Sequence, residues 1–361
     1  MRQHNVVNNQ QGLIAIIVSM ILMIILSLIV LGFATNTRRE QRQSLDRQLN
    51  SRAFYAAESG INDAREYIKD QLALGAQIKK FDKCGSAGGL DSFSSTPGYN
   101  NIIEGGSSYP CLLIDPTPPT ITYGSLSKDD SVAFPVKSAT ITPITELTVS
   151  WQQDNKEAPR SYGGCPSVGT FPKESDWDVS VCSAGMLRID LTPVTNLSRA
   201  ALIDNTKSFL LQPSGGGTSA ISFGVINKGQ VIGVNCTVNI TPTTAAPKDC
   251  NVVISGLTDP EGYYMRVRPI YRNASMQFSG SVGSTFEGVQ AVVDSTGKSS
   301  DVLKRLQVRL SINTLESDNN TSFNYAIQSL DSICKKYSVI PAPTSKVSSL
   351  NPDPSCAAPG P

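Results

Sequence analysis

The feature that most constrains this chain is an uncharged, almost wholly apolar run from Leu13 to Ala34. A helix of about 20 residues crosses the hydrocarbon core of a bilayer, so a run of this length can span it. About fifteen of its residues are Leu, Ile, Val or Phe, and each favours insertion by roughly 0.3 to 0.6 kcal/mol. A signal peptide has a shorter apolar core and ends in a small-x-small cleavage motif, which this run lacks. We therefore predict a transmembrane helix over residues 13–34.

The helix is predicted to continue beyond the membrane. No proline interrupts the chain from Leu13 to Leu74, and apolar or small residues recur at steps of three or four. The stripe consists of Leu45, Leu49, Ala53, Ala56, Gly60, Ile61, Ala64, Ile68 and Leu72. This spacing marks one face of an amphipathic helix, so we expect a single helix over 13–74. The small residues within 51–60 would let another helix or a sheet pack closely. A stalk that carries its own globular domain is the simpler interpretation.

The cysteines indicate where the rest of the chain folds. There are eight, all beyond the apolar run, at Cys84, Cys111, Cys165, Cys182, Cys236, Cys250, Cys334 and Cys356. None forms a C-x-x-C pair, which argues against a zinc ribbon or a thioredoxin-type motif. We interpret them as disulfides formed outside the cytoplasm, with free buried thiols as the alternative. Spacing alone does not fix the connectivity, but pairing each cysteine with its neighbour along the chain would close short loops.

Charge gives a conflicting indication of topology. Five arginines follow the apolar run and would keep that flank in the cytoplasm under the positive-inside rule. They are Arg38, Arg39, Arg42, Arg47 and Arg52. Because disulfides require an oxidising compartment, we follow the cysteines and predict a single-pass membrane protein with its C-terminal part outside the cytoplasm.

Composition and strand patterns predict a β-rich domain after the helix. Charged residues make up only 17%, whereas the chain has 28 Gly and 22 Pro, as is typical of extracellular β proteins with many turns. Short β-type runs punctuated by Gly and Pro favour an antiparallel sheet or sandwich. The predicted fold class is therefore α+β, with a long N-terminal helix and an antiparallel β-rich domain stapled by disulfides. Residues 294–297 (DSTG) are typical of a turn between two of the strands.

The predicted organisation has five parts. They are a leader (1–12), the helix (13–74), an irregular Gly/Ser/Pro-rich connection (75–135), a β-rich extracellular domain (136–338) ending in a short helix (323–338), and a Pro-rich tail (339–361).

The N-terminal part of the chain, about residues 8–70, resembles a known family. A polar leader ending at Gly12, an apolar helix starting at Leu13, and the stretch FYAAESGI (54–61) resemble PilX-type minor pilins and the related tip pseudopilin of type II secretion. The resemblance implies that a prepilin peptidase cuts between Gly12 and Leu13. It also implies that the helix packs with other pilins in a filament core, at a membrane assembly platform, and that the β domain lies outside. Ile17 stands where major pilins carry a glutamate, which fits a minor or tip subunit.

Within that resemblance, one set of residues is expected to pack between helices. It comprises Ala53, Ala56, Ala57, Glu58 and Gly60. Their small side chains would allow helices to approach closely in the membrane and then in the fibre.

Catalytic and ligand-binding chemistry finds little support in the sequence. The single histidine, His4, lies in the leader, so no His-based triad or metal site is expected in the external part. Glu174, Asp176 and Asp178 alternate and are weak calcium candidates, with a solvated strand face as the alternative. A glycosidase-type pair of carboxylates comes together only in the fold, so the sequence alone does not decide whether one is present. With 31 basic and 30 acidic residues the charge is balanced, which argues against nucleic acid. We expect no enzyme activity, cofactor, small-molecule substrate or resident metal.

Two functions therefore remain. The first is a structural minor subunit of a type IV pilus or related filament, with its β domain displayed for assembly priming or adhesion. The second is a permanently anchored extracellular binding or adhesion protein that does not assemble. The fate of the Gly12–Leu13 bond separates them.

Overall fold

The computed structural model describes residues 10–84, 102–103, 106–128, 130–154, 160–166, 168, 174, 177, 182–239 and 247–312, all within one compact unit, Met1–Ser317. Several predictions lie outside these residues: the leader up to residue 9 with His4, the helix at 323–338, the tail at 339–361, and the cysteines Cys334 and Cys356.

The predicted long helix is confirmed as α1 (Gln10–Ala73), one continuous helix of 64 residues. It stops at a glycine cap. Gly75 takes a left-handed conformation with φ of 63°, and its N–H donates to the carbonyl of Leu72 at 3.0 Å. The N–H of Ala76 reaches back to the carbonyl of Gln71 at 2.9 Å, which completes a Schellman motif.

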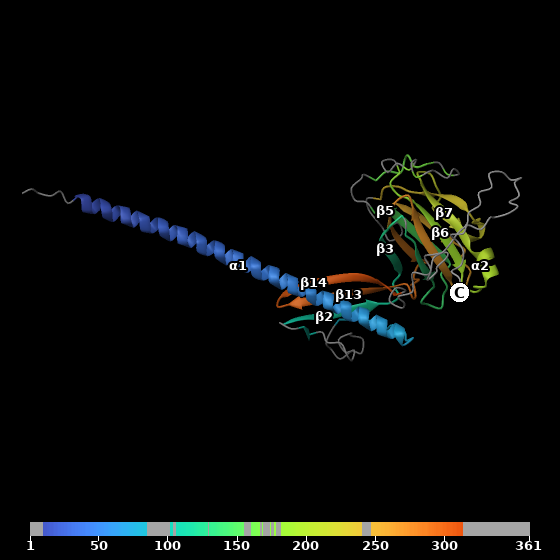
Figure 1. Ribbon diagram of the computed structural model, residues 1–361, viewed down its shortest axis with the longest axis horizontal. Helices are drawn as coiled ribbons and strands as arrows, with labels where there is room; N and C mark the ends of the chain where they lie inside the picture. The colour runs from blue at the N-terminus through green and yellow to red at the C-terminus, as the bar shows by residue number, and fades with distance from the viewer. Residues whose placement is uncertain are drawn as a thin grey trace, which may run out of the picture. The chain divides into compact units, whose positions relative to one another are not determined.

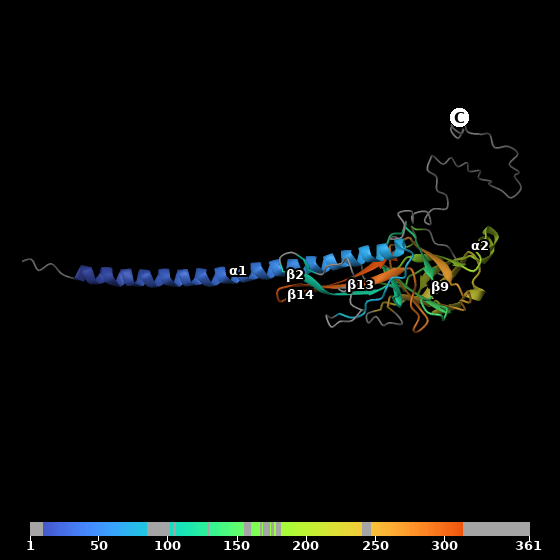
Figure 2. The ribbon, with the colours of Figure 1, turned by 90° about the horizontal axis from the view of Figure 1, so that it is seen from below.

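The C-terminal part of α1 lies across a small antiparallel sheet (Figures 1 and 2). Its strands run in the order β1 (Ile102–Ile103), β2 (Ser107–Asp115), β13 (Gln290–Ser299) and β14 (Val302–Ser311). Ala64, Tyr67 and Ile68 of α1 share an apolar core with Ile114 and Val293 of this sheet. In this sheet β2 pairs with β13, although the two strands lie far apart in the sequence.

Two five-stranded sheets form between β2 and β13. The first contains β3 (Thr120–Leu126), β12 (Ala274–Gly280), β5 (Glu146–Gln153), β10 (Cys250–Ser255) and β8 (Ala220–Ser222). The second contains β4 (Val132–Val136), β11 (Tyr263–Ile270), β6 (Met186–Pro193), β7 (Lys207–Ser214) and β9 (Gln230–Asn235). Most pairs are antiparallel, but β8 with β10 and β7 with β9 are parallel.

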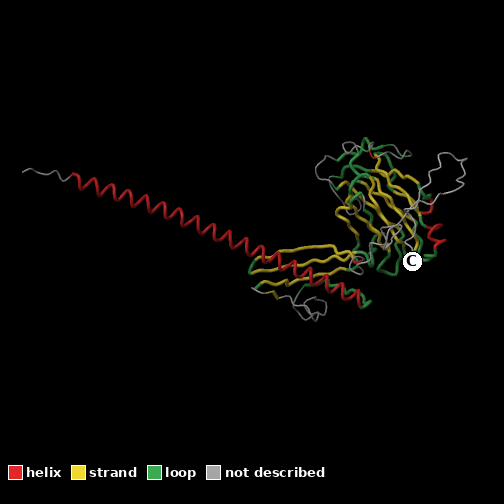
Figure 3. Tube along the Cα trace, in the orientation of Figure 1, coloured by secondary structure: helices red, strands yellow, loops and turns green. Residues whose placement is uncertain are grey.

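The two five-stranded sheets bury one shared core and so make a β-sandwich. Phe134 from one sheet meets Phe278 from the other with ring centroids 5.1 Å apart, and Trp151 is fully buried between them. Along β11 the alternation is clear, since Tyr263 and Met265 are buried whereas Tyr264 is exposed. A short helix, α2 (Arg199–Asn205), and a 3-10 turn, η3 (Phe223–Val225), lie among the strands and loops of this region (Figure 3). The predicted β-rich domain is confirmed.

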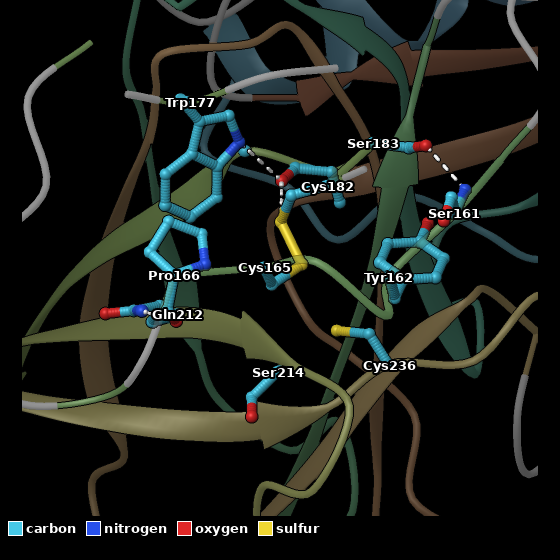
Figure 4. Close-up of a disulfide and its surroundings, with 12 residues drawn as sticks. Ser161, Tyr162, Cys165, Pro166, Trp177, Cys182, Ser183, Gln212, Ser214 and Cys236 are labelled. Carbon is cyan, nitrogen blue, oxygen red and sulfur yellow. Dashed lines mark hydrogen bonds between the residues drawn. A yellow bond between two sulfur atoms is a disulfide. The ribbon is translucent and has the colours of Figure 1, made fainter. Parts of the chain in front are cut away.

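Three disulfides confirm neighbour pairing wherever the cysteines are described. The pairs are Cys84–Cys111, Cys165–Cys182 and Cys236–Cys250. Around Cys165–Cys182, Trp177 lies over the bridge and its indole N–H donates to the carbonyl of Ala184 at 3.1 Å (Figure 4). Each of these disulfides closes a loop of fewer than thirty residues, as the sequence separations of 27, 17 and 14 show.

Two local predictions are wrong. The segment 75–135 is not an irregular connection, because it contains β2, β3 and most of β4. Its Gly and Pro content hid alternating strands such as SSYPCLLID, whose buried positions face the cores. Residues 294–297 are not a turn but the middle of β13. The chain turns at Ser300 and Asp301, where Ser300 has a φ of 54°.

Candidate assembly interface

The N-terminal half of α1 is an apolar surface that the described chain leaves uncovered. From Ile16 to Phe33 every large apolar side chain is about half exposed or more, from 48% at Ile29 to 72% at Met23. This is the one helix of the described residues long and apolar enough to cross a membrane. Exposure on this scale in water would be costly, so a bilayer or neighbouring apolar helices must cover it.

Three hydroxyl groups at or near this apolar half are satisfied within the helix. The hydroxyl of Ser19 donates to the carbonyl of Ile16, and that of Thr35 donates to Gly32, each at 2.9 Å. Thr37 does the same with Phe33 at 2.9 Å. Because no water is needed to satisfy these hydroxyls, the segment can sit in lipid or in a dry bundle of helices.

Gly12 and Leu13 lie inside the first turns of α1, which begins at Gln10. The bond between them, where cleavage is predicted, thus lies near the start of the helix. Ile17, the position where major pilins have an acid, is 49% exposed and forms part of the apolar surface.

A glycine in the sheet sets the closest approach between α1 and β13. A Cβ atom on Gly297 would collide with the backbone carbonyl of Ala53 and the backbone N–H of Ala57, and would lie 3.1 Å from the carbonyl carbon of Ala56. On the helix side, a Cβ on Gly60 would lie 3.0 Å from the ring of Tyr109 and would also collide with the hydroxyl of Ser295. The two elements thus pack backbone to backbone, which only glycine and alanine permit.

This contact corrects the role predicted for the small residues. Ala53, Ala56 and Ala57 are at most 1% exposed and Gly60 is buried, all against the chain's own sheet. They are therefore unavailable for packing between subunits at that level of the helix. Glu58 differs from the others because it lies on the exposed side of α1. The stretch FYAAESGI (54–61) thus marks a helix-to-sheet joint in this chain.

A hydrogen bond between side chains also stabilises this joint between α1 and the sheet. The phenol of Tyr109 on β2 donates to the carboxylate of Asp63 on α1. Next to the buried alanines, Phe54 and Tyr55 remain 44% and 66% exposed and stack edge to face with centroids 5.8 Å apart. These aromatic rings, rather than the alanines, form the outward surface of α1 beside the sheet.

Between the apolar surface and the sheet, α1 is a bare polar segment. Every side chain from Arg38 to Arg47 is exposed. The stretch from Arg38 to Arg52 contains five arginines and two acidic residues, Glu40 and Asp46. The net charge there is +3, from five arginines minus two acids. The disulfides support an extracytoplasmic location for this flank, although the sense of insertion stays a prediction.

The calcium candidates are not assembled as a site in the part of the chain that the structure describes. The carboxylate of Glu174 pairs with the ammonium of Lys128 at 2.6 Å, and this hydrogen bond lowers the pKa of Glu174. Asp176 and Asp178 lie outside the described residues. No group of three or more potential metal ligands occurs among the residues described.

Sequence reasoning missed a buried charge in the sandwich. The carboxylate of Asp249, with a fully buried side chain, accepts from Arg160 at 2.6 Å, from the Tyr162 hydroxyl at 2.7 Å and from the backbone N–H of Asn239 at 2.9 Å. Burial is the main cause that raises the pKa of Tyr162 well above its usual range, and the hydrogen bond to the Asp249 carboxylate adds to it. Asp249 precedes Cys250, so the network holds the Cys236–Cys250 bridge and the loop of residues 160–166 together. A single acid before a cysteine gave no signal in the sequence.

Comparison with known proteins gives one match, on the first helix. The PilX N-terminal family model matches residues 11–62, which include Gly12, the whole apolar surface and the joint at Ala53 to Gly60. No curated protein and no solved structure gives a match to this chain. The family match thus rests on α1 alone.

Proposed function

We propose that this chain, whose first helix matches the PilX N-terminal family model, is a minor subunit of a type IV pilus or related filament, with a structural rather than a catalytic role. The observation that carries the proposal is the uncovered apolar half of α1 inside that domain. A membrane covers this surface before assembly, and the helices of other pilins cover it afterwards.

The division of α1 into two halves supports this function. Its N-terminal half contacts nothing in the described chain, whereas its C-terminal half is fixed to the sheet by Gly297 and the buried alanines. The small sheet therefore moves with the helix when the helix passes from lipid into a bundle, and the sandwich follows through its chain connections to β2 and β13. In this proposal the filament core takes the apolar half, and the β domain is displayed for assembly priming or for adhesion.

The partners follow from the same proposal. They are a prepilin peptidase acting at Gly12–Leu13, an assembly platform in the membrane, and other pilins. The relation to the tip pseudopilin of type II secretion remains a prediction of the sequence pattern.

A substitution at the processing site tests the function. Gly12→Ala, expressed with the peptidase and pilus machinery, should leave the chain uncut and absent from sheared filaments. The matched control is Gly32→Ala on the same helix, where an added Cβ meets nothing within 4 Å. That variant should be processed like the unaltered chain. If Gly12→Ala leaves both length and location unchanged, the chain is a permanently anchored protein, and the filament role is refuted.

A further inference from the structure

The outer edge of β14 is open along its whole length. The sheet order places β14 last, and no described strand pairs with its far side. The β13–β14 hairpin pairs ten residues on each strand without a register shift, from Ser299 with Val302 to Gln290 with Ser311. Unlike many natural edge strands, it carries neither a bulge in this ladder nor a proline. It is a ready template for another strand.

The direction of the free backbone groups follows from the hairpin. A two-residue turn closes on a hydrogen-bonded pair, here Ser299 with Val302, and bonded and non-bonded pairs then alternate. At the far end Ile312 donates to the carbonyl of Val289 at 2.9 Å, which agrees with this phase. The even-numbered residues of β14 therefore bond to β13. The residues that direct N–H and C=O outward are Leu303, Arg305, Gln307 and Arg309.

A strip of half-covered apolar side chains runs beside this edge. On the helix-facing side of β14, Leu306 and Val308 are only partly buried. On α1, Ile61 packs against the same core, and Phe54, seven residues earlier and so on the same side of the helix, is 44% exposed. A strand added to β14 would cover these side chains as well as pairing the edge.

Charge decides what kind of strand fits. From Val302 to Ser311 the strand contains three cations, Lys304, Arg305 and Arg309, and no acid. The nearby Asp294 is already used by Arg305, which holds it with two hydrogen bonds from Nε at 2.8 and 2.9 Å. A second copy of β14 would set cation against cation across the new pairing, which is unfavourable. An incoming strand with acidic side chains would be attracted.

We propose that β14 is a strand-addition site for an extended segment of a different protein. The segment is about nine residues long, as the ten-residue strand allows. Its apolar side chains point toward α1, and its acidic side chains point to the opposite face of the sheet, which carries Arg305 and Arg309. Backbone hydrogen bonds to the outward groups supply affinity, and the alternating side chains supply specificity. This site is independent of processing at Gly12, so it can exist in a pilus subunit or in an anchored receptor.

The test uses the full chain in detergent and a fluorescein-labelled nine-residue peptide that alternates valine and glutamate. Fluorescence anisotropy should show saturable binding. Gln307→Pro removes an outward N–H without touching the β13 ladder and should weaken binding about tenfold or more, whereas Gln307→Ala keeps that N–H and should bind like the unaltered chain. A peptide with lysine in place of glutamate should bind at least about tenfold more weakly.

The controls separate a broken fold from a lost site. Hydrogen exchange of the β13 amides should be the same in Gln307→Pro and Gln307→Ala, since β13 bonds to the even-numbered residues. Equal peptide binding by the two variants would overturn the proposal, and so would absence of binding by the unaltered chain. A self-association that Gln307→Pro abolishes in sedimentation would also overturn it, because a second copy would then occupy the edge.

Discussion

The joint between α1 and the small sheet makes a sharp prediction at Gly297. In the variant Gly297→Ala the new methyl group collides with backbone atoms of Ala53 and Ala57, which no rotation of a side chain can move aside. The helix must withdraw from β13, and the packing of Ala64 and Ile68 on the sheet loosens with it. Overpacking of this kind typically costs about 1 to 3 kcal/mol. We expect the loss to be concentrated in the joint rather than spread over the sandwich.

Hydrogen exchange with mass spectrometry measures this loss locally. At about 1.4 kcal/mol per factor of ten, amides of β13 and of α1 beyond Ala53 should exchange roughly 5- to 150-fold faster in Gly297→Ala. Amides of β5 and β6 in the sandwich should not change.

The matched control for Gly297 is Gly124 in β3, another strand glycine. An added Cβ there meets nothing within 4 Å, so Gly124→Ala should be neutral or slightly stabilising. Gly60→Ala should fall between the two, because Ser295 and Tyr109 are side chains with some freedom to move. If Gly297→Ala exchanges no faster than Gly124→Ala, the backbone-to-backbone contact does not hold α1 on the sheet, and this account of the small residues is wrong.

Three further predictions concern the sandwich. Asp249→Asn removes the charge that pairs with Arg160 and should lower the free energy of unfolding by about 1 to 3 kcal/mol, as measured by thermal unfolding. Asp190→Asn, the control at a more exposed ion pair, should change the free energy of unfolding little. Burial raises the pKa of Tyr123 well above its ordinary value of 10.0, so the folded state keeps a proton that the unfolded state loses first. Stability should therefore fall as pH rises above about 10, and Tyr123→Phe should lessen that fall; an unchanged alkaline profile would contradict the assignment. Replacing Cys165 and Cys182 together by serine should lower the free energy of unfolding by about 3 kcal/mol, because the unfolded chain gains the entropy of the loop that the bridge closes. Denaturant unfolding measures this loss, and an unchanged free energy of unfolding would contradict the prediction.

Local sequence patterns predicted the local structure of this chain well. The proline-free run and its stripe predicted one helix, which the structure gives as Gln10–Ala73. Short β-type runs punctuated by Gly and Pro predicted a β-rich domain, which contains strands such as β5 and β11. Pairing each cysteine with its neighbour along the chain predicted the three described disulfides. In each case the residues that interact lie near one another in the sequence.

Long-range contacts could not be predicted in the same way. β2 pairs with β13, with Ile114 opposite Val293, and the whole sandwich lies between them in the sequence. Gly297 looked like a turn residue because Asp, Ser, Thr and Gly favour turns, but its role is to admit the helix backbone. The small residues at 53–60 showed that something packs closely there, and the sequence left open whether a helix or a sheet does so. Only the tertiary pairing decides that.

The most direct test of the central claim is the intact mass of the chain recovered from sheared filaments of a host with the pilus machinery. The account predicts that the protein is present in the sheared fraction and begins at Leu13, having lost its first twelve residues. A chain that still begins at Met1, or that stays entirely in the membrane fraction, would contradict it.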